Sequence, residues 1–254
     1  RRFRRGGGRI VETFQGRTMD LLVITQAFFM LGFVAMAAGT VYFILERGDL
    51  KPQHRIAATY AAIITFIAAI MYWIMTGFVG FFDQTPASAD AIGATVEIRY
   101  IDWLLTTPLL LVEFGIIVAI AGAATKGFVT RIVIADIIMI VTGYLGEISP
   151  VGALETWVYF IISSLAWLYI VYAVFQVKLD GMPAYAANAV KIMRRFVMFG
   201  WAIYPIGTSI EQFMKLGGAD VTAAVAIAAI VYVIADVLNK VGFGMVAVNA
   251  AKKA

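Results

Sequence analysis

The stretch from Arg99 to Glu113 reads Arg-Tyr-Ile-Asp-Trp-Leu-Leu-Thr-Thr-Pro-Leu-Leu-Leu-Val-Glu, and it decides the fold class. It lies in an apolar segment, residues 96–121, that exceeds the roughly 20 residues a helix needs to cross a bilayer. Asp102 and Glu113 are eleven residues apart, so on a helix they share one face about 16 Å apart along the axis. A charge in the hydrocarbon costs about 2.5–3.5 kcal/mol and is usually functional. The stretch therefore predicts a membrane-spanning helix with a functional polar stripe.

Six more apolar segments accompany this one in the chain of 254 residues. Hydrophobic residues make up 62% of the chain and charged residues 14%, against roughly 45–50% and about 25% in soluble domains. The expected spans are 19–45, 56–82, 96–121, 129–147, 153–177, 192–214 and 222–249. The connections between them are short, so consecutive helices should be antiparallel neighbours. We expect an all-α membrane protein with seven transmembrane helices, a basic tail at 1–18, a seven-helix domain at 19–250 and a short tail at 251–254.

The composition also excludes several classes of protein. The high apolar content excludes a disordered chain, a nucleic-acid binder and an ordinary cytosolic enzyme. Cysteine is absent, which excludes disulfides, thiol catalysis and Cys-ligated metals. His54 is the single histidine, so a histidine metal site or a Ser–His–Asp triad is not expected. We expect no metal and no enzymatic activity.

The distribution of Lys and Arg predicts the orientation of the bundle, because short cytoplasmic loops collect these residues. One side holds Arg47, Lys51, Arg55, Lys126, Arg131, Lys178, Lys191, Arg194, Arg195, Lys252 and Lys253. The opposite loops hold only Lys215. This bias places the N-terminus outside the cell and the C-terminus in the cytoplasm. The arginines of residues 1–18 conflict with it, and two interpretations stay open: the segment is non-native or upstream sequence before Met19, or it is a basic extracellular tail.

The last expected span contains a second group of charges. Lys240 lies deep in this span, and Asp236 precedes it by four residues, on the same helix face. Burial disfavours the charged ammonium, which makes such a lysine suited to Schiff-base chemistry. A simple buried Asp–Lys pair between helices is the alternative from spacing alone.

The motifs of the third and seventh spans together resemble the microbial rhodopsins. The resemblance rests on the stretch from Arg99 to Pro108 and on Asp-Val-Leu-Asn-Lys at 236–240. Gly-Trp-Ala-Ile-Tyr-Pro at 200–205 and Gly-Tyr-Leu-Gly-Glu at 143–147 support it. The whole chain from about Met19 to Ala250 fits this family, and the trio of Asp102, Thr106 and Glu113 is similar to that of the proteorhodopsin type.

The resemblance implies a role for each charged residue inside the membrane. Lys240 would carry all-trans retinal as a protonated Schiff base. Asp102 would be the primary proton acceptor and main counterion, and Asp236 the second counterion. Arg99 would be the cation on the extracellular side, and Glu113 the cytoplasmic proton donor. We expect Glu113 to be neutral at rest, because its apolar surroundings disfavour a carboxylate.

The resemblance also implies a retinal pocket. Its walls would be Tyr72, Trp103, Thr107, Leu110, Met139, Gly143, Trp201, Tyr204 and Pro205. Tyr72 would bond Asp236, and Thr106 would bond Asp102. Proteorhodopsins usually pair the acceptor with a histidine of the second helix, and Met71 occupies that place here. The resemblance therefore leaves the working pH range open.

These roles predict a light-driven outward proton pump. With the N-terminus outside, the third helix runs from outside to inside, so Asp102 lies outward of Glu113. A sensory photoreceptor and a light-driven proton channel or inward proton carrier remain alternatives, as does a seven-helix transporter without retinal. Chloride and sodium pumps are disfavoured, because Asp102 stands where an anion would need a neutral residue and the sodium pumps' Asn–Asp–Gln trio is absent.

The expected setting is the inner membrane of a bacterium, which the chain crosses several times. Relatives form rings, so a pentamer or hexamer is expected in addition to lipid, retinal and protons as partners. Phe160 occupies a place where relatives with a carotenoid antenna have glycine, so no antenna is expected.

Overall fold

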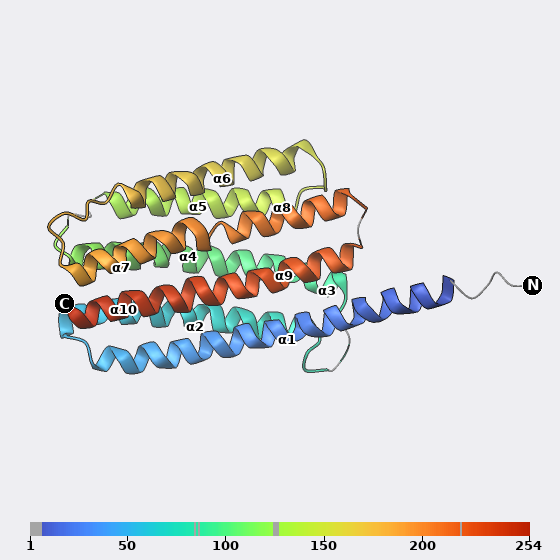
Figure 1. The fold of residues 1–254 in the computed structure, drawn as a ribbon, viewed down its shortest axis with the longest axis horizontal. Helices are drawn as coiled ribbons and strands as arrows, with labels where there is room; N and C mark the ends of the chain where they lie inside the picture. Colours follow the sequence, from blue (N-terminus) through green and yellow to red (C-terminus); the bar gives the residue numbers. More distant parts are fainter. Residues whose placement is uncertain (1–6, 84, 86, 124–126, 219) are drawn as a thin grey trace, which may run out of the picture.

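The computed structural model describes residues 7–83, 85, 87–123, 127–218 and 220–254, and their side chains from Leu21 onward. Long helices run side by side in one bundle, and the described residues contain no strand (Figure 1). The helices are α1 Gly7–Gly48, η1 Pro52–His54, α2 Arg55–Phe78, α3 Ala89–Gly93, α4 Thr95–Ile120, α5 Phe128–Glu147, α6 Leu154–Phe175, α7 Ala184–Arg195, η2 Phe196–Gly200, α8 Ile203–Leu216, α9 Val221–Val237, η3 Leu238–Gly242 and α10 Phe243–Lys253. The expected membrane helical bundle is confirmed.

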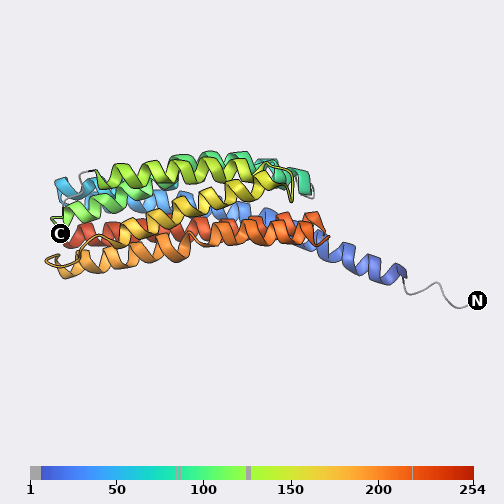
Figure 2. The same cartoon turned by 90° about the horizontal axis from the view of Figure 1, so that it is seen from above.

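Twelve of these elements of the described residues form seven rods, and η1 is a short turn before α2. Four rods are the single helices α1, α2, α5 and α6, and α4 is a fifth that follows the short α3. The sixth rod is α7–η2–α8 and the seventh is α9–η3–α10. Helix α1 extends beyond its neighbours at the N-terminal end, as both views show (Figure 1, Figure 2). Its backbone is helical from Gly7, and the part apolar enough to cross a membrane, Leu21–Gly48, lies close to the expected span 19–45.

The sixth helix begins before the expected span 192–214, because α7 begins at Ala184, within the stretch expected to be a connection. The first turns of α7 are not apolar enough to stand out by hydropathy, but they are strongly amphipathic. The buried face of α7 consists of Ala186, Ala189, Val190, Met193 and Arg194. Packing of this face, rather than insertion of an apolar stretch, therefore sets where the rod begins.

The bundle has an apolar outside and a polar centre. Large apolar side chains such as Leu45, Phe66 and Leu165 are more than half exposed on its surface. Four carboxylic side chains are fully buried inside: Asp102, Glu113, Asp136 and Asp236. Six of the rods have helices long and apolar enough to cross a membrane. This arrangement fits a multi-pass membrane protein, in which lipid covers the outer faces and ionisable groups face the bundle interior.

Two rods contain a π-helical turn near the bundle centre. In the sixth rod, η2 lies directly before Trp201, and the Trp201 N–H donates to the Phe196 carbonyl at 2.9 Å, five residues back. In the seventh rod, η3 contains Lys240. π-Helical turns are rare and often occur at functional sites. The region between Trp201 and Lys240 is therefore a candidate functional site.

Candidate functional site

The centre of the site is Lys240 with two aspartates. Its Nζ lies 2.5 Å from Asp102 Oδ2 and 3.4 Å from Asp236 Oδ1. Only 1% of the lysine side chain is exposed, and the aspartates are fully buried. Asp102 comes from α4, whereas Asp236 is one turn before Lys240 in α9. Because an unpaired buried ion is very costly, a positive nitrogen here depends on both carboxylates.

Three donors from three rods hold the Asp236 carboxylate. The Tyr72 hydroxyl donates to Oδ2 at 2.7 Å, and Trp103 Nε1 donates to Oδ1 at 3.1 Å. The Tyr204 hydroxyl also donates to Oδ1, at 2.7 Å. Hydrogen bonds to a carboxylate favour its charged form and fix its orientation. Asp236 is therefore the more firmly held aspartate, since Asp102 Oδ1 is buried without a hydrogen-bond partner.

Close packing of α1 against α2 positions Tyr72. A Cβ at Gly32 would lie 2.6 Å from Tyr72 Cδ1, so only glycine leaves room for the tyrosine ring. Met71, the residue before it, packs against the apolar cluster formed by α1, α2 and α9. This segment thus supplies the Asp236 donor Tyr72 and, directly before it, the apolar side chain of Met71.

Arg99 lies one turn before Asp102 on α4, and it is buried. Its guanidinium donates to Thr95 Oγ1 at 3.2 Å, and its Cζ lies 5.0 Å from the ring centroid of Tyr232. Tyr232 in turn shares a 2.9 Å hydrogen bond with Thr208. In the part of the chain that the structure describes, Arg99 forms no ion pair with Asp102 or Asp236. Arg99 is therefore held by Thr95 and Tyr232 beside the aspartates rather than paired with them.

Two neighbouring threonines of α4 have different partners. Thr106 donates to the main-chain carbonyl of Asp102 at 2.8 Å, so its hydrogen bond to Asp102 involves the backbone rather than the carboxylate. Thr107 Oγ1 lies 2.8 Å from the Trp103 carbonyl and also 2.8 Å from Asp136 Oδ2, and the second contact connects α4 to α5. Asp136 Oδ1 is buried without a partner. The pair of Thr107 and Asp136 is thus a second polar contact, separate from the ion pair of Lys240.

Glu113 lies further along α4, between apolar side chains. Its side chain is fully buried, and neither carboxylic oxygen has a hydrogen-bond partner. Leu110, Leu111, Phe114 and Ile117 pack in the apolar cluster around it. An isolated carboxyl group in such surroundings is stable only in its neutral form.

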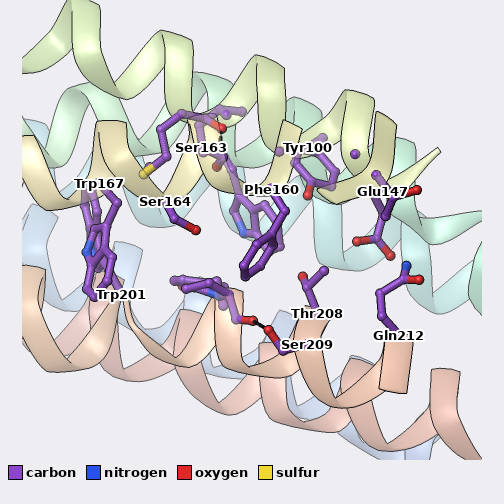
Figure 3. A pocket seen from close by; sticks show the side chains of 18 of the residues that line it. Tyr100, Glu147, Phe160, Ser163, Ser164, Trp167, Trp201, Thr208, Ser209 and Gln212 are labelled. Carbon is purple, nitrogen blue, oxygen red and sulfur yellow. Dashed lines mark hydrogen bonds between the residues drawn. The ribbon is translucent and has the colours of Figure 1, made fainter. Parts of the chain in front are cut away.

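A cavity lies between α4, α5, α6 and α8 (Figure 3), and Lys240, Asp102 and Asp236 are not among the residues that line it. Trp103 and Tyr204, both donors to Asp236, are among its lining residues. Trp167 and Trp201 lie at one end of it and Glu147 and Gln212 at the other (Figure 3). The expected wall residues that line it are Trp103, Thr107, Met139, Gly143, Trp201, Tyr204 and Pro205. Tyr72 and Leu110 do not line this cavity, although both are buried.

Comparison with known proteins agrees with this geometry. The model of the family described as "Bacteriorhodopsin-like protein" matches residues 23–254. The chain belongs to the bacteriorhodopsin-like family. The green-light absorbing proteorhodopsin of Gamma-proteobacterium EBAC31A08 is 32% identical over 242 residues, which cover 94% of this chain and 90% of that relative. The crystal structure of Exiguobacterium sibiricum rhodopsin has a TM-score of 0.80 and 42% identity, covering 92% of this chain and 97% of that one. The blue light-absorbing proteorhodopsin from Med12 has a TM-score of 0.71 and 32% identity, covering 91% and 98%.

The residues of this microbial rhodopsin fit the retinal that the family implies. Lys240 supplies a buried amine beside two carboxylates, and Asp102 Oδ1 retains an unused acceptor. Aromatic side chains from α4, α6, η2–α8 and the intervening residues line the adjacent cavity: Tyr100, Trp103, Trp157, Phe160, Trp167, Trp201 and Tyr204. Gly143 allows close approach, because a Cβ there would lie 3.3 Å from Ser163 Oγ. Aromatic walls that include two hydrogen-bond donors to Asp236, the aspartate next to the Lys240 amine, suit a long apolar aldehyde bound through that lysine.

Several residues of the site were missed by reasoning from sequence. Tyr232 is buried against Arg99, and Tyr100 lines the cavity. Asn239 donates to the Gly200 carbonyl at 2.9 Å and so joins the two π-helical turns. The available signal was the position of Asn239 directly before Lys240 in an otherwise apolar helix.

Proposed function

We propose that this protein is a light-driven outward proton pump, a transporter rather than an enzyme, with all-trans retinal on Lys240. The observation that carries the proposal is the 2.5 Å separation of Lys240 Nζ from Asp102 Oδ2 inside a fully buried site. Membership of the bacteriorhodopsin-like family and similarity to proteorhodopsins support it. Retinal bound as a protonated Schiff base would supply light-driven isomerisation and a positively charged nitrogen.

In this proposal Asp102 accepts the proton from the Lys240 nitrogen. Asp102 Oδ2 is at hydrogen-bond distance from Nζ, and its Oδ1 has no donor. Asp236, in contrast, accepts three hydrogen bonds that occupy both of its carboxylate oxygens and fix its orientation. Asp102 therefore takes the proton, and Asp236 remains the permanent negative charge. Arg99 offsets the excess negative charge of the pair from one turn away.

Glu113 returns a proton to the same nitrogen from the other side. It lies on the same helix as Asp102, about three turns further along. Its neutral, apolar surroundings keep a proton available for transfer. The loop bias of Lys and Arg places this end of α4 toward the cytoplasm. A proton taken up from the cytoplasm through Glu113 and released to the outside past Asp102 is then transported outward.

The same proposal covers the setting of the protein. We place it in the inner membrane of a bacterium, with residues 19–250 as the retinal-binding domain and 251–254 as a cytoplasmic tail. Residues 1–18 are then either an extracellular tail or non-native sequence. A ring of five or six copies is the proposed assembly. No carotenoid antenna is proposed, and the bulk of Phe160 in the cavity lining supports this (Figure 3).

Recording of pH in an illuminated suspension of cells expressing the protein with retinal tests the proposal. Outward pumping predicts acidification of the medium that an uncoupler abolishes and that Lys240→Ala lacks. Alkalinisation would reverse the direction and favour an inward carrier or a channel. A coloured, light-responsive protein without any pH change would favour a sensory photoreceptor.

A further inference from the structure

The main-chain hydrogen bonds of the sixth rod are displaced around Pro205. Proline has no N–H, so the Trp201 carbonyl, four residues earlier, lacks its ordinary helical donor. The Tyr204 N–H donates to this carbonyl instead, at 3.2 Å. In a regular α-helix the Tyr204 N–H would donate to the Gly200 carbonyl. The missing donor is therefore transferred from the Trp201 carbonyl to the Gly200 carbonyl, one residue earlier. The Gly200 carbonyl is therefore left without a donor from its own helix.

Asn239 of the seventh rod supplies the missing donor. Its Nδ2 donates to the Gly200 carbonyl at 2.9 Å, and its side chain is almost completely buried. In a membrane protein, side chains of neighbouring helices commonly satisfy carbonyls that a proline releases. The same Nδ2 lies 3.4 Å from the Tyr204 hydroxyl, which donates to Asp236 at 2.7 Å. The Asn239 amide therefore donates both to the Gly200 carbonyl of the distorted helix and to the Tyr204 hydroxyl, which itself donates to the counterion Asp236.

Gly200 and Asn239 are matched in shape. A Cβ at Gly200 would lie 1.9 Å from Asn239 Oδ1 and 2.9 Å from its Cγ, distances that real Cβ atoms do not show. Only glycine at 200 leaves room for the amide in this position. Asn239 directly precedes Lys240 within η3, and Gly200 directly precedes Trp201 at the end of η2. The contact therefore joins the two π-helical turns beside the lysine and beside a cavity wall.

We propose that Asn239 is a positioning residue that couples the distortion at Pro205 to the placement of Lys240 and to the Tyr204–Asp236 hydrogen bond. The inference rests on the proposed function, because it assigns a role relative to the retinal-bearing lysine. Asn239 acts through Gly200 and Tyr204 and takes no proton itself. Loss of its amide frees the Gly200 carbonyl and leaves the Tyr204 oxygen without a donor.

Asn239→Ala tests the effect on the counterion by absorption spectroscopy with retinal bound. Without the amide, Tyr204 becomes a weaker donor, so the charge on Asp236 is less dispersed and holds the positive nitrogen more strongly. Stronger pairing of Asp236 with the positive nitrogen lowers the energy of the ground electronic state of the retinal relative to its excited state. We therefore expect the absorption maximum to shift to shorter wavelength. Thr65→Val is the matched control, because it removes the buried 3.0 Å hydrogen bond between Thr40 and Thr65, which involves none of the residues bonded to Lys240 or Asp236. We expect no shift in this control, and an unshifted Asn239→Ala would overturn the proposal.

Hydrogen–deuterium exchange of the retinal-free protein tests the contact between Asn239 and Gly200 independently of pigment formation. Asn239→Ala should exchange faster than wild type across 196–204, whereas Thr65→Val should not. If Asn239→Ala does not fold, Asn239→Asp keeps the shape and removes the NH₂ donor. If a folded Asn239 variant exchanged across 196–204 at the wild-type rate, the proposed role of the Asn239–Gly200 contact would be overturned. A colourless wild type would contradict the proposed function instead, and the exchange result would still stand.

Coupling between Asn239 and Pro205 gives the most specific result. Pro205→Ala restores an N–H for the Trp201 carbonyl and lets Tyr204 donate to Gly200 again. Asn239→Ala should then accelerate exchange less in the Pro205→Ala background than in wild type. Equal effects in both backgrounds would show that the two residues act independently and would contradict the proposed coupling.

Discussion

Asp102 and Glu113 are fully buried on the same helix, but only Asp102 has a cationic partner. Asp102 Oδ2 lies 2.5 Å from Lys240 Nζ, whereas both oxygens of Glu113 have no partner at all. A charged carboxylate is stable in the first environment and costly in the second. Helix α4 thus holds one group ready to accept a proton and, eleven residues further along, one group that keeps its proton.

Asp102→Asn should shift the absorption of the retinal-bound protein to longer wavelength and abolish pumping. The substitution removes the nearest negative charge from the nitrogen, which destabilises the ground state and leaves no acceptor. Absorption spectra and light-induced pH recording measure the two effects. Asp136→Asn serves as the control, since Asp136 contacts Thr107 rather than Lys240. Continued pumping by Asp102→Asn would contradict the acceptor role.

Glu113→Gln should slow return of the proton to the Lys240 nitrogen by about 10²–10⁴-fold, the range for loss of a positioned acid. The amide preserves shape and neutrality but has no proton to give. Flash photolysis measures the recovery rate, and the initial loss of the proton should remain fast. Glu147→Gln is the matched control, because Glu147 lies at the other end of the bundle, on the cavity. Equal slowing in both variants would argue against a donor role for Glu113.

Gly32→Ala should destabilise the protein by about 1–3 kcal/mol, as overpacking does. The new methyl group would lie 2.6 Å from Tyr72 Cδ1 and would displace the ring whose hydroxyl donates to Asp236. Thermal unfolding followed by circular dichroism measures the loss. Gly77→Ala is the control, because a Cβ at Gly77 would meet no atom within 4 Å. A normal melting temperature for Gly32→Ala would show that Tyr72 is not tightly confined.

Arg194→Ala should loosen the end of α6. The buried guanidinium donates to the Val174 carbonyl at 2.7 Å and also to the Val177 carbonyl, so it satisfies carbonyls that the helix end leaves free. A hydrogen bond to a charged group is worth about 1.5–3 kcal/mol, and we expect a loss of this size in thermal unfolding. Arg195→Ala removes an exposed neighbour and should have little effect. Similar losses in both variants would indicate a general charge effect.

Sequence predicted the bundle because a lipid-facing helix must be apolar over a length that the bilayer fixes. It failed at the start of the sixth rod, where Ala184 and the next residues pack against other helices and need not be apolar on every side. The continuation of α1 back to Gly7 was also missed, since helical backbone does not require an apolar sequence.

The site was predictable as far as ionisable residues identify it. Charges are rare in apolar helices, so the sequence alone singles out Lys240, Asp102 and Asp236. The structure places both aspartates within 3.4 Å of the lysine nitrogen. The partner of Thr106 was not predictable, because a hydroxyl chooses between carboxylate and carbonyl by local geometry. The role of Asn239 depends on a carbonyl released by Pro205 in another rod, which no local pattern reveals.

The most direct test locates the bond to retinal. The protein is reconstituted with all-trans retinal, reduced with borohydride under illumination, digested and analysed by mass spectrometry. The account predicts a coloured protein with the added mass on the peptide that contains Lys240, and no pigment from Lys240→Ala. A colourless wild type, or the label on a different lysine, would contradict it.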